Sequence, residues 1–88
     1  MPYIPQESRT RIRHILDILP VANEGEANYA VTYILHRWLG PNYRYANINA
    51  AIGVLECAKL ELYRMIAAPY EDQKRLENGP VLLEEDDA

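Results

Sequence analysis

The fold is decided by the stretch NINAAIGVLECAKLELYRMIAAPYEDQKRLENG, residues 47–79. Asn47 is a good N-cap residue, and Gly53 is the only strong helix breaker before Pro69. Apolar residues recur in this stretch at helical spacing, which predicts one long helix with a core-facing stripe. The stripe contains Ile48, Ala51, Ile52, Leu55, Leu62 and Ile66.

Pro69 is the one residue that interrupts this helix. Its ring lacks an amide donor and clashes with the carbonyl one turn back, near Met65. Two outcomes fit the sequence: the helix kinks and continues to residue 77, or Pro69 begins a separate short helix in its first turn. Asn78 and Gly79 end the helix in either case.

Two shorter helices precede the long one. The first is expected over residues 6–19, where Pro20 stops it, and the second over residues 26–39, where Gly40 and Pro41 stop it. No segment shows the sustained alternation of a half-buried strand. The sequence therefore predicts an all-α fold of three helices, the third long and either Pro-kinked or broken. It forms a single domain over residues 1–83 that opens with an arm, residues 1–5.

Charge and composition exclude several classes of protein. The 88 residues carry nine Lys and Arg against thirteen Asp and Glu, and four of the acids lie in residues 84–87. We therefore expect residues 84–88 to form an acidic, disordered tail on a neutral body, which argues against general nucleic-acid binding. No apolar run approaches the ~18 residues of a membrane span. The single Cys57 excludes an internal disulfide, so a cytoplasmic location is expected.

The length of the third helix predicts self-association. Residues 48–77 span about 45 Å as a helix, whereas a compact chain of this size is roughly 30 Å across. Ala50, Ala51, Gly53 and Ala58 allow a second helix to approach closely. We expect a homo-oligomer built on this helix. The alternative is a three-helix monomer with the segment after Pro69 folded back.

The sequence does not predict an enzyme. His14 and His36 fall on different helices, Ser8 is the only serine, and no metal-ligand spacing or Gly-rich phosphate loop occurs. We expect no catalytic residue, no metal and no cofactor.

Binding is the function that the composition favours. The chain has seven Tyr, one Trp and no Phe. Aromatic planes beside cationic donors suit a nucleotide-like anion, whose base stacks and whose phosphate accepts hydrogen bonds. The same residue types anchor protein interfaces, and the sequence does not separate the two uses. The ligand-binding candidates are Tyr29, Tyr33, Arg37, Lys59, Tyr63, Arg64 and Tyr70, with Arg9 and Arg13 as phosphate donors.

Part of this set lies on the third helix. If the helix continues past Pro69, the spacing places Glu56, Lys59, Tyr63, Tyr70 and Lys74 on one polar and aromatic face. The alternative is an ordinary solvated face on which Glu56 pairs with Lys59.

Four segments of the chain resemble a known family. They are the opening MPYI, ANYAVT at residues 27–32, IGVLECAKLELYR at 52–64, and PYEDQK at 69–74 followed by ENG at 77–79. They resemble a family of small uncharacterised proteins of phages and bacteria that carries a domain-of-unknown-function label. The resemblance covers most of the chain and is strongest over residues 47–79. The family has an acidic residue after Asn-Gly, where this chain has Pro80.

The resemblance implies a phage-related setting. Small oligomeric helical phage proteins include sponges, which bind and hide the nucleotide second messengers of bacterial immunity. By this analogy we expect a non-enzymatic anti-defence protein that sequesters a cyclic nucleotide or ADP-ribose-type ligand, in the host-cell cytoplasm if phage-encoded. The alternative is a protein-binding adaptor or inhibitor with no small-molecule ligand.

Overall fold

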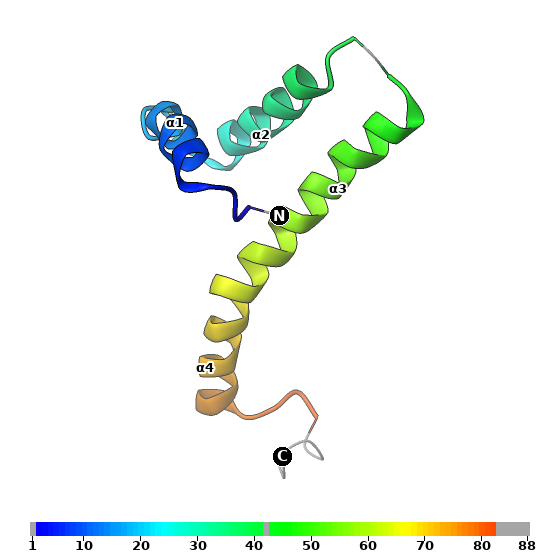
Figure 1. Cartoon of the computed structure of the whole chain (residues 1–88). Helices are drawn as coiled ribbons and strands as arrows, with labels where there is room; N and C mark the ends of the chain where they lie inside the picture. The colour runs from blue at the N-terminus through cyan, green and yellow to red at the C-terminus, as the bar shows by residue number, and fades with distance from the viewer. Residues whose placement is uncertain (1, 42, 83–88) are drawn as a thin grey trace. The chain divides into compact units, whose positions relative to one another are not determined.

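A computed structural model describes residues 2–41 and 43–82 of the chain (Figure 1). The described residues form α1 (Gln6–Leu16), α2 (Glu24–Leu39), α3 (Tyr45–Leu62), a π-helical turn (Tyr63–Ala67) and α4 (Ala68–Asn78). No strand occurs in this part of the chain, so the all-α prediction is confirmed. The predicted acidic tail, residues 84–88, lies outside the described residues.

The chain divides into two compact units within α3. Unit 1 ends at Leu55 and contains the N-terminal arm, α1, α2 and the first part of α3. Unit 2 begins at Glu56 and contains the rest of α3, the π-helical turn and α4.

Helix α1 ends earlier than the sequence predicts. Its last residue is Leu16 rather than residue 19. The backbone then tightens, because Ile18 and Leu19 donate their amides to carbonyls three residues back, at 3.3 and 3.1 Å. The residue before a proline avoids the helical region, so Pro20 unwinds the chain ahead of itself.

Helix α2 begins with a side-chain cap that the sequence analysis did not identify. The Asn23 side chain accepts a hydrogen bond from the Glu26 amide at 2.9 Å. The Glu26 carboxylate in turn accepts one from the Ala22 amide at 2.8 Å. This reciprocal arrangement resembles a capping box and starts the helix at Glu24 rather than at Glu26. At the other end Gly40 adopts a φ of 68°, as expected for a helix-terminating glycine.

The third helix is continuous past Pro69. It runs for 34 residues, from Tyr45 to Asn78, through α3, the π-helical turn and α4. Its start at Tyr45 places Asn47 in the first turn, so the predicted N-cap at Asn47 is wrong. Of the two outcomes left open at Pro69, the structure has the continuing helix, because Leu62, Ala67 and Ala68 all have right-handed helical backbone angles.

The proline is accommodated by one wider turn. The Ala68 amide donates to the carbonyl of Tyr63, five residues back, as in a π-helix. Pro69 then falls in the first turn of α4, where its missing amide costs least. The wider turn gives the proline ring room beside the carbonyl of Met65, which explains why the helix does not break.

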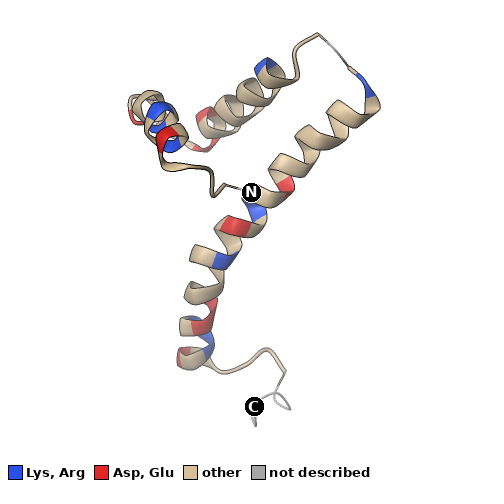
Figure 2. Ribbon diagram, in the orientation of Figure 1, with Lys and Arg blue, Asp and Glu red and all other residues tan. Residues whose placement is uncertain are grey.

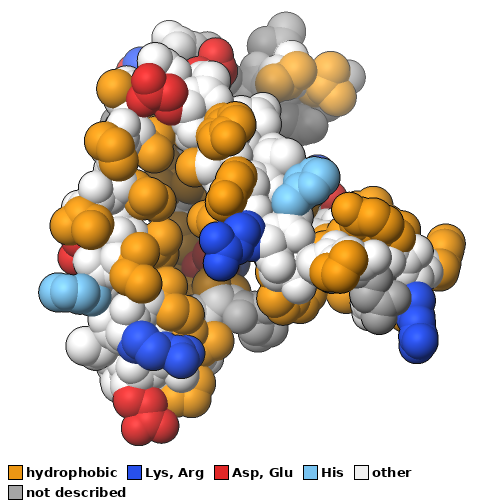
Figure 3. All heavy atoms as spheres, turned by 90° about the horizontal axis from the view of Figure 1, so that it is seen from above, with side chains coloured by type: hydrophobic (Ala, Val, Ile, Leu, Met, Phe, Trp, Pro, Cys, Tyr) orange, Lys and Arg blue, Asp and Glu red, His pale blue; other side chains and the backbone are white. Residues whose placement is uncertain are grey.

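The predicted core stripe is only partly supported. In unit 1 the stripe does face α2, because Ile48, Ala51, Ile52 and Leu55 line a hollow of about 190 Å³ together with Leu35 and Leu39. Ala51 is nevertheless the only buried hydrophobic residue among those described. In unit 2 the prediction of a buried stripe is wrong for the single chain, since Leu62 and Ile66 are 60% and 63% exposed. Hydrophobic side chains are accordingly visible over the surface of the helices (Figure 3).

Candidate functional site

The two units differ in charge. Unit 1 contains five Arg against four Asp and Glu, whereas unit 2 contains four Lys and Arg against nine acids. Helix α1 contains Arg9, Arg11 and Arg13 against one acid, Glu7, and Figure 2 shows blue segments together with red on this helix. The side chains best suited to binding an anion are therefore concentrated on α1.

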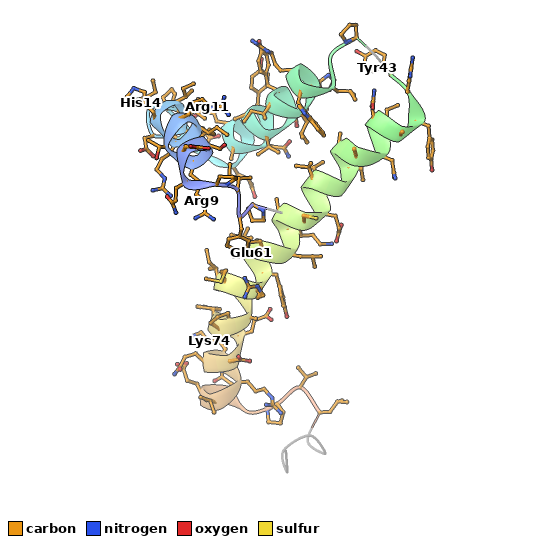
Figure 4. All side chains as sticks on the ribbon, viewed as in Figure 1. Arg9, Arg11, His14, Tyr43, Glu61 and Lys74 are labelled. Atoms are coloured by element: carbon orange, nitrogen blue, oxygen red, sulfur yellow. The ribbon has the colours of Figure 1, made fainter. Side chains whose placement is uncertain are left out.

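Arg9 holds the N-terminal arm against α1. Its Nε donates a hydrogen bond of 2.7 Å to the carbonyl of Ile4. Its guanidinium carbon lies 5.8 Å from the centroid of the Tyr3 ring, within the range of a cation–π contact. Figure 4 shows Arg9 on the side of α1 next to the arm. The N-terminal arm is thus held to the first turn of α1 by these two contacts of Arg9.

The two predicted phosphate donors on α1 line a single cavity. Arg9 and Arg13 border a space of about 370 Å³, together with Tyr3 from the arm. Ile12 and Leu16 contribute apolar lining, and Asp17 also lines the cavity. Positions 9, 12, 13 and 16 fall on one face of a helix, which explains why all four line the same cavity.

The aromatic candidates on α2 also lie together. The rings of Tyr29 and Tyr33 stack with centroids 6.0 Å apart and an interplanar angle of 30°. Both rings line an apolar groove of about 590 Å³. The other lining residues are Leu19, Pro20, Val21, Gly25, Glu26, Ala30 and Ile34. Arg37 follows Tyr33 by one turn but does not line this groove, and no Lys or Arg does.

The cationic candidates of unit 2 are paired with acids. The Lys59 Nζ lies 3.1 Å from a Glu56 carboxylate oxygen. Arg64 contacts both carboxylate oxygens of Glu61 at 3.2 Å. These exposed local pairs match the solvated-face alternative for Glu56 and Lys59.

Tyr63 and Tyr70 make different contacts from each other. The Tyr63 hydroxyl donates a hydrogen bond of 3.0 Å to Glu71. This hydrogen bond, followed by the negative charge of Glu71, raises the pKa of Tyr63 above its ordinary value of 10.0. Tyr70 instead lies under Lys74, whose Nζ is 5.6 Å from the ring centroid. The predicted aromatic face of the third helix is therefore occupied by contacts within unit 2.

The sequence analysis missed Tyr3 and Glu71 as members of these clusters. A signal for Tyr3 was present, because Pro2 and Pro5 restrict the arm to an extended path from which Tyr3 can reach back to α1. No comparable signal exists for Glu71, whose position depends on the π-helical turn.

The described residues show no gathering of three or more His, Cys, Asp or Glu side chains that could hold a metal ion. Cys57, on α3, is exposed. No helix within residues 2–41 and 43–82 is both long enough and apolar enough to cross a membrane.

The resemblance to a family of uncharacterised proteins is confirmed. The chain belongs to the family described as Domain of unknown function (DUF6899), whose model matches residues 1–81. Comparison with curated proteins and with solved structures gave no match.

Proposed function

We propose that this is a non-catalytic binding protein that acts as a homo-oligomer and sequesters a small nucleotide-like anion. The supporting observation is a difference in charge pairing: Arg9, Arg13 and Arg37 have no acidic partner among the described residues. Lys59 and Arg64, by contrast, are paired. An unpaired guanidinium keeps its fork of donors available to a phosphate.

Aromatic side chains of unit 1 supply the second requirement of such a ligand. Tyr3 lies beside Arg9, and Tyr33, whose ring stacks on Tyr29, precedes Arg37 by one turn. A planar base gains affinity by stacking on rings of this kind. In a phage-infected bacterial cell, a protein with these properties would act as a sponge for a nucleotide immune signal in the cytoplasm.

Homo-oligomerisation is supported by the exposure of large apolar side chains. In unit 2, Leu62 and Ile66 lie four residues apart and are 60% and 63% exposed in the single chain. Large exposed apolar side chains of this kind favour an interaction site, and a second copy can cover them. Light scattering at micromolar concentration tests this directly. We expect a multiple of the 10.1 kDa chain mass, and a 10.1 kDa species at every concentration would contradict it.

Ligand binding is tested by thermal shift and calorimetry against cyclic dinucleotides, cyclic trinucleotides and cyclic ADP-ribose isomers. A ligand present at 100 times its dissociation constant stabilises the folded state by about 2.7 kcal/mol. The bound nucleotide should be recovered chemically intact after denaturation, because no turnover is proposed. Arg37→Gln should weaken binding, and Arg44→Gln, outside the candidate set, serves as its control. Absence of binding across the panel would contradict sequestration.

The apolar groove beside Tyr29 and Tyr33 favours a second candidate function. Its lining contains no cation, which suits an apolar segment of a partner protein better than an anion. In this case the protein is an adaptor or inhibitor. Ile34→Glu, in the groove, would then abolish the biological effect, whereas Ile18→Glu, outside it, would not. Loss of the effect in Arg37→Gln with Ile34→Glu unaffected would favour the nucleotide ligand.

A further inference from the structure

The cavity between the N-terminal arm and α1 is partly organised before any ligand binds. The Arg9 Nε donates a 2.7 Å hydrogen bond to the Ile4 carbonyl, and its guanidinium carbon lies 5.8 Å from the centroid of the Tyr3 ring. These contacts hold the side chain while its two terminal nitrogens remain available as donors. A side chain held in place in this way loses less conformational entropy when a ligand binds.

Arg13 adds a second positive charge to the same wall. It follows Arg9 by four residues, and both line the cavity. Like charges at this spacing repel each other across one helical turn, and the described residues provide no ion pair for either arginine. An anion placed between the two guanidiniums would remove this repulsion and accept hydrogen bonds from both.

The other residues that line the cavity indicate that the anionic group of the ligand is attached to a planar ring. Ile12 and Leu16 give the cavity an apolar part of its lining and remain 40% and 45% exposed. Tyr3 supplies an aromatic plane, and the Asp17 carboxylate in the lining supplies an acceptor. A bare phosphate would use only the arginines. A volume of about 370 Å³ lies at the lower end of the range for small-molecule pockets, about 300–1,000 Å³.

We infer that this cavity binds a phosphorylated nucleoside, with Arg9 and Arg13 contacting the phosphate and Tyr3, Ile12 and Leu16 contacting the ring. Asp17 accepts a hydrogen bond from a ring amino or N–H group. The inference rests on the proposed function, which it extends by placing the phosphate end of the ligand on α1 in every protomer.

The test is calorimetry on the full chain with three probes: AMP, adenosine and inorganic phosphate. AMP should bind more tightly than either of its parts. Arg13→Gln should weaken AMP binding by about ten-fold or more, because a hydrogen bond to a charged group is worth about 1.5–3 kcal/mol. Tyr3→Leu should weaken AMP and adenosine but leave phosphate unchanged.

Arg11→Gln is the matched control. Arg11 lies on the same helix and does not line the cavity, so its loss removes one charge and leaves the proposed contacts intact (Figure 4). Equal weakening by Arg11→Gln and Arg13→Gln would overturn the inference, because it would indicate non-specific attraction. Circular dichroism of each variant checks that α1 and the rest of the helical fold are retained.

Two further outcomes separate this inference from the proposed function. If the nucleotides of the wider panel bind and Arg13→Gln leaves their affinity unchanged, this site is overturned and sequestration stands. If phosphate binds through Arg13 with no preference for AMP, the nucleoside part of the inference is overturned. Failure of all three probes also overturns the site, while the cyclic-nucleotide panel decides sequestration independently.

Discussion

The Tyr63 hydroxyl donates a hydrogen bond of 3.0 Å to Glu71, eight residues further along the same helix. In an uninterrupted α-helix, residues seven apart lie almost directly above one another, and that position relative to Tyr63 belongs to Tyr70. The π-helical turn Tyr63–Ala67 adds about one residue to the local repeat, so Glu71 takes this place. Pro69 thus affects which side chains meet on the surface of the helix.

The first prediction concerns the titration of Tyr63. Its pKa is raised above the ordinary value of 10.0, chiefly because the protonated hydroxyl donates to Glu71. The hydrogen bond therefore contributes stability below that ordinary value, and the contribution is lost as the pH rises through the raised pKa. Glu71→Gln should lower the pKa of Tyr63 toward 10.0. Tyrosine-labelled NMR titration measures this, with Tyr63→Phe to assign the resonance. A wild-type Tyr63 that titrates at or below its ordinary value would contradict the structure.

The second prediction concerns Pro69→Ala. Alanine restores an amide donor and removes the ring, so the wide turn should relax to a regular α-helix. Tyr63 would then face Tyr70 instead of Glu71, and its pKa should fall as in Glu71→Gln. We expect circular dichroism to show unchanged helix content and light scattering to show an altered oligomer. Pro80→Ala, beyond α4, is the control. An unchanged Tyr63 pKa together with an unchanged oligomer mass would contradict this explanation of the turn.

The helices themselves were predictable because their signals are local. The apolar spacing, Pro20, Gly40 and Gly79 placed all three helices, and the errors were confined to their ends. The start of α2 was missed because the Asn23 cap depends on a hydrogen bond from the Glu26 amide, in a segment that also fits a loop. The sequence could not decide what happens at Pro69. A kink, a break and a π-helical turn each relieve the clash between the proline ring and the carbonyl one turn back.

The sequence indicated which types of residue the candidate sites would use. It indicated less well which of these residues would lie together. Spacing by four placed Tyr29 and Tyr33 on one face, where their rings stack, and Arg9 and Arg13 on another, where both line one cavity. It could not show that Glu61 would engage Arg64, since an acid three residues away competes for any arginine on an exposed helix. Nor could helical spacing bring Tyr3 to Arg9, because the arm reaches α1 through a backbone carbonyl contact.

A third prediction tests the cap of α2. Asn23→Ala removes the acceptor for the Glu26 amide and should lower the free energy of unfolding by about 1 kcal/mol. Chemical denaturation measures the loss. Asn49→Ala is the control, because the Asn49 side chain is exposed on α3 and has no hydrogen-bond partner among the described residues. Equal losses in the two variants would mean that the cap is not formed in solution.

The last prediction connects the exposed stripe of the third helix to assembly. Leu62 is 60% exposed in the single chain, so its truncation removes little buried area there. In a homo-oligomer that covers the stripe, Leu62→Ala should cost about 2–5 kcal/mol, the range for buried leucines. The loss should therefore appear as weaker association: a lower mass at a given concentration in light scattering and a melting temperature that depends more steeply on protein concentration. Leu76→Ala is the matched control, since Leu76 is 81% exposed and lies outside the stripe. If both variants keep the wild-type mass and melting temperature at every concentration, a second copy does not cover this stripe, and the oligomer must use another surface.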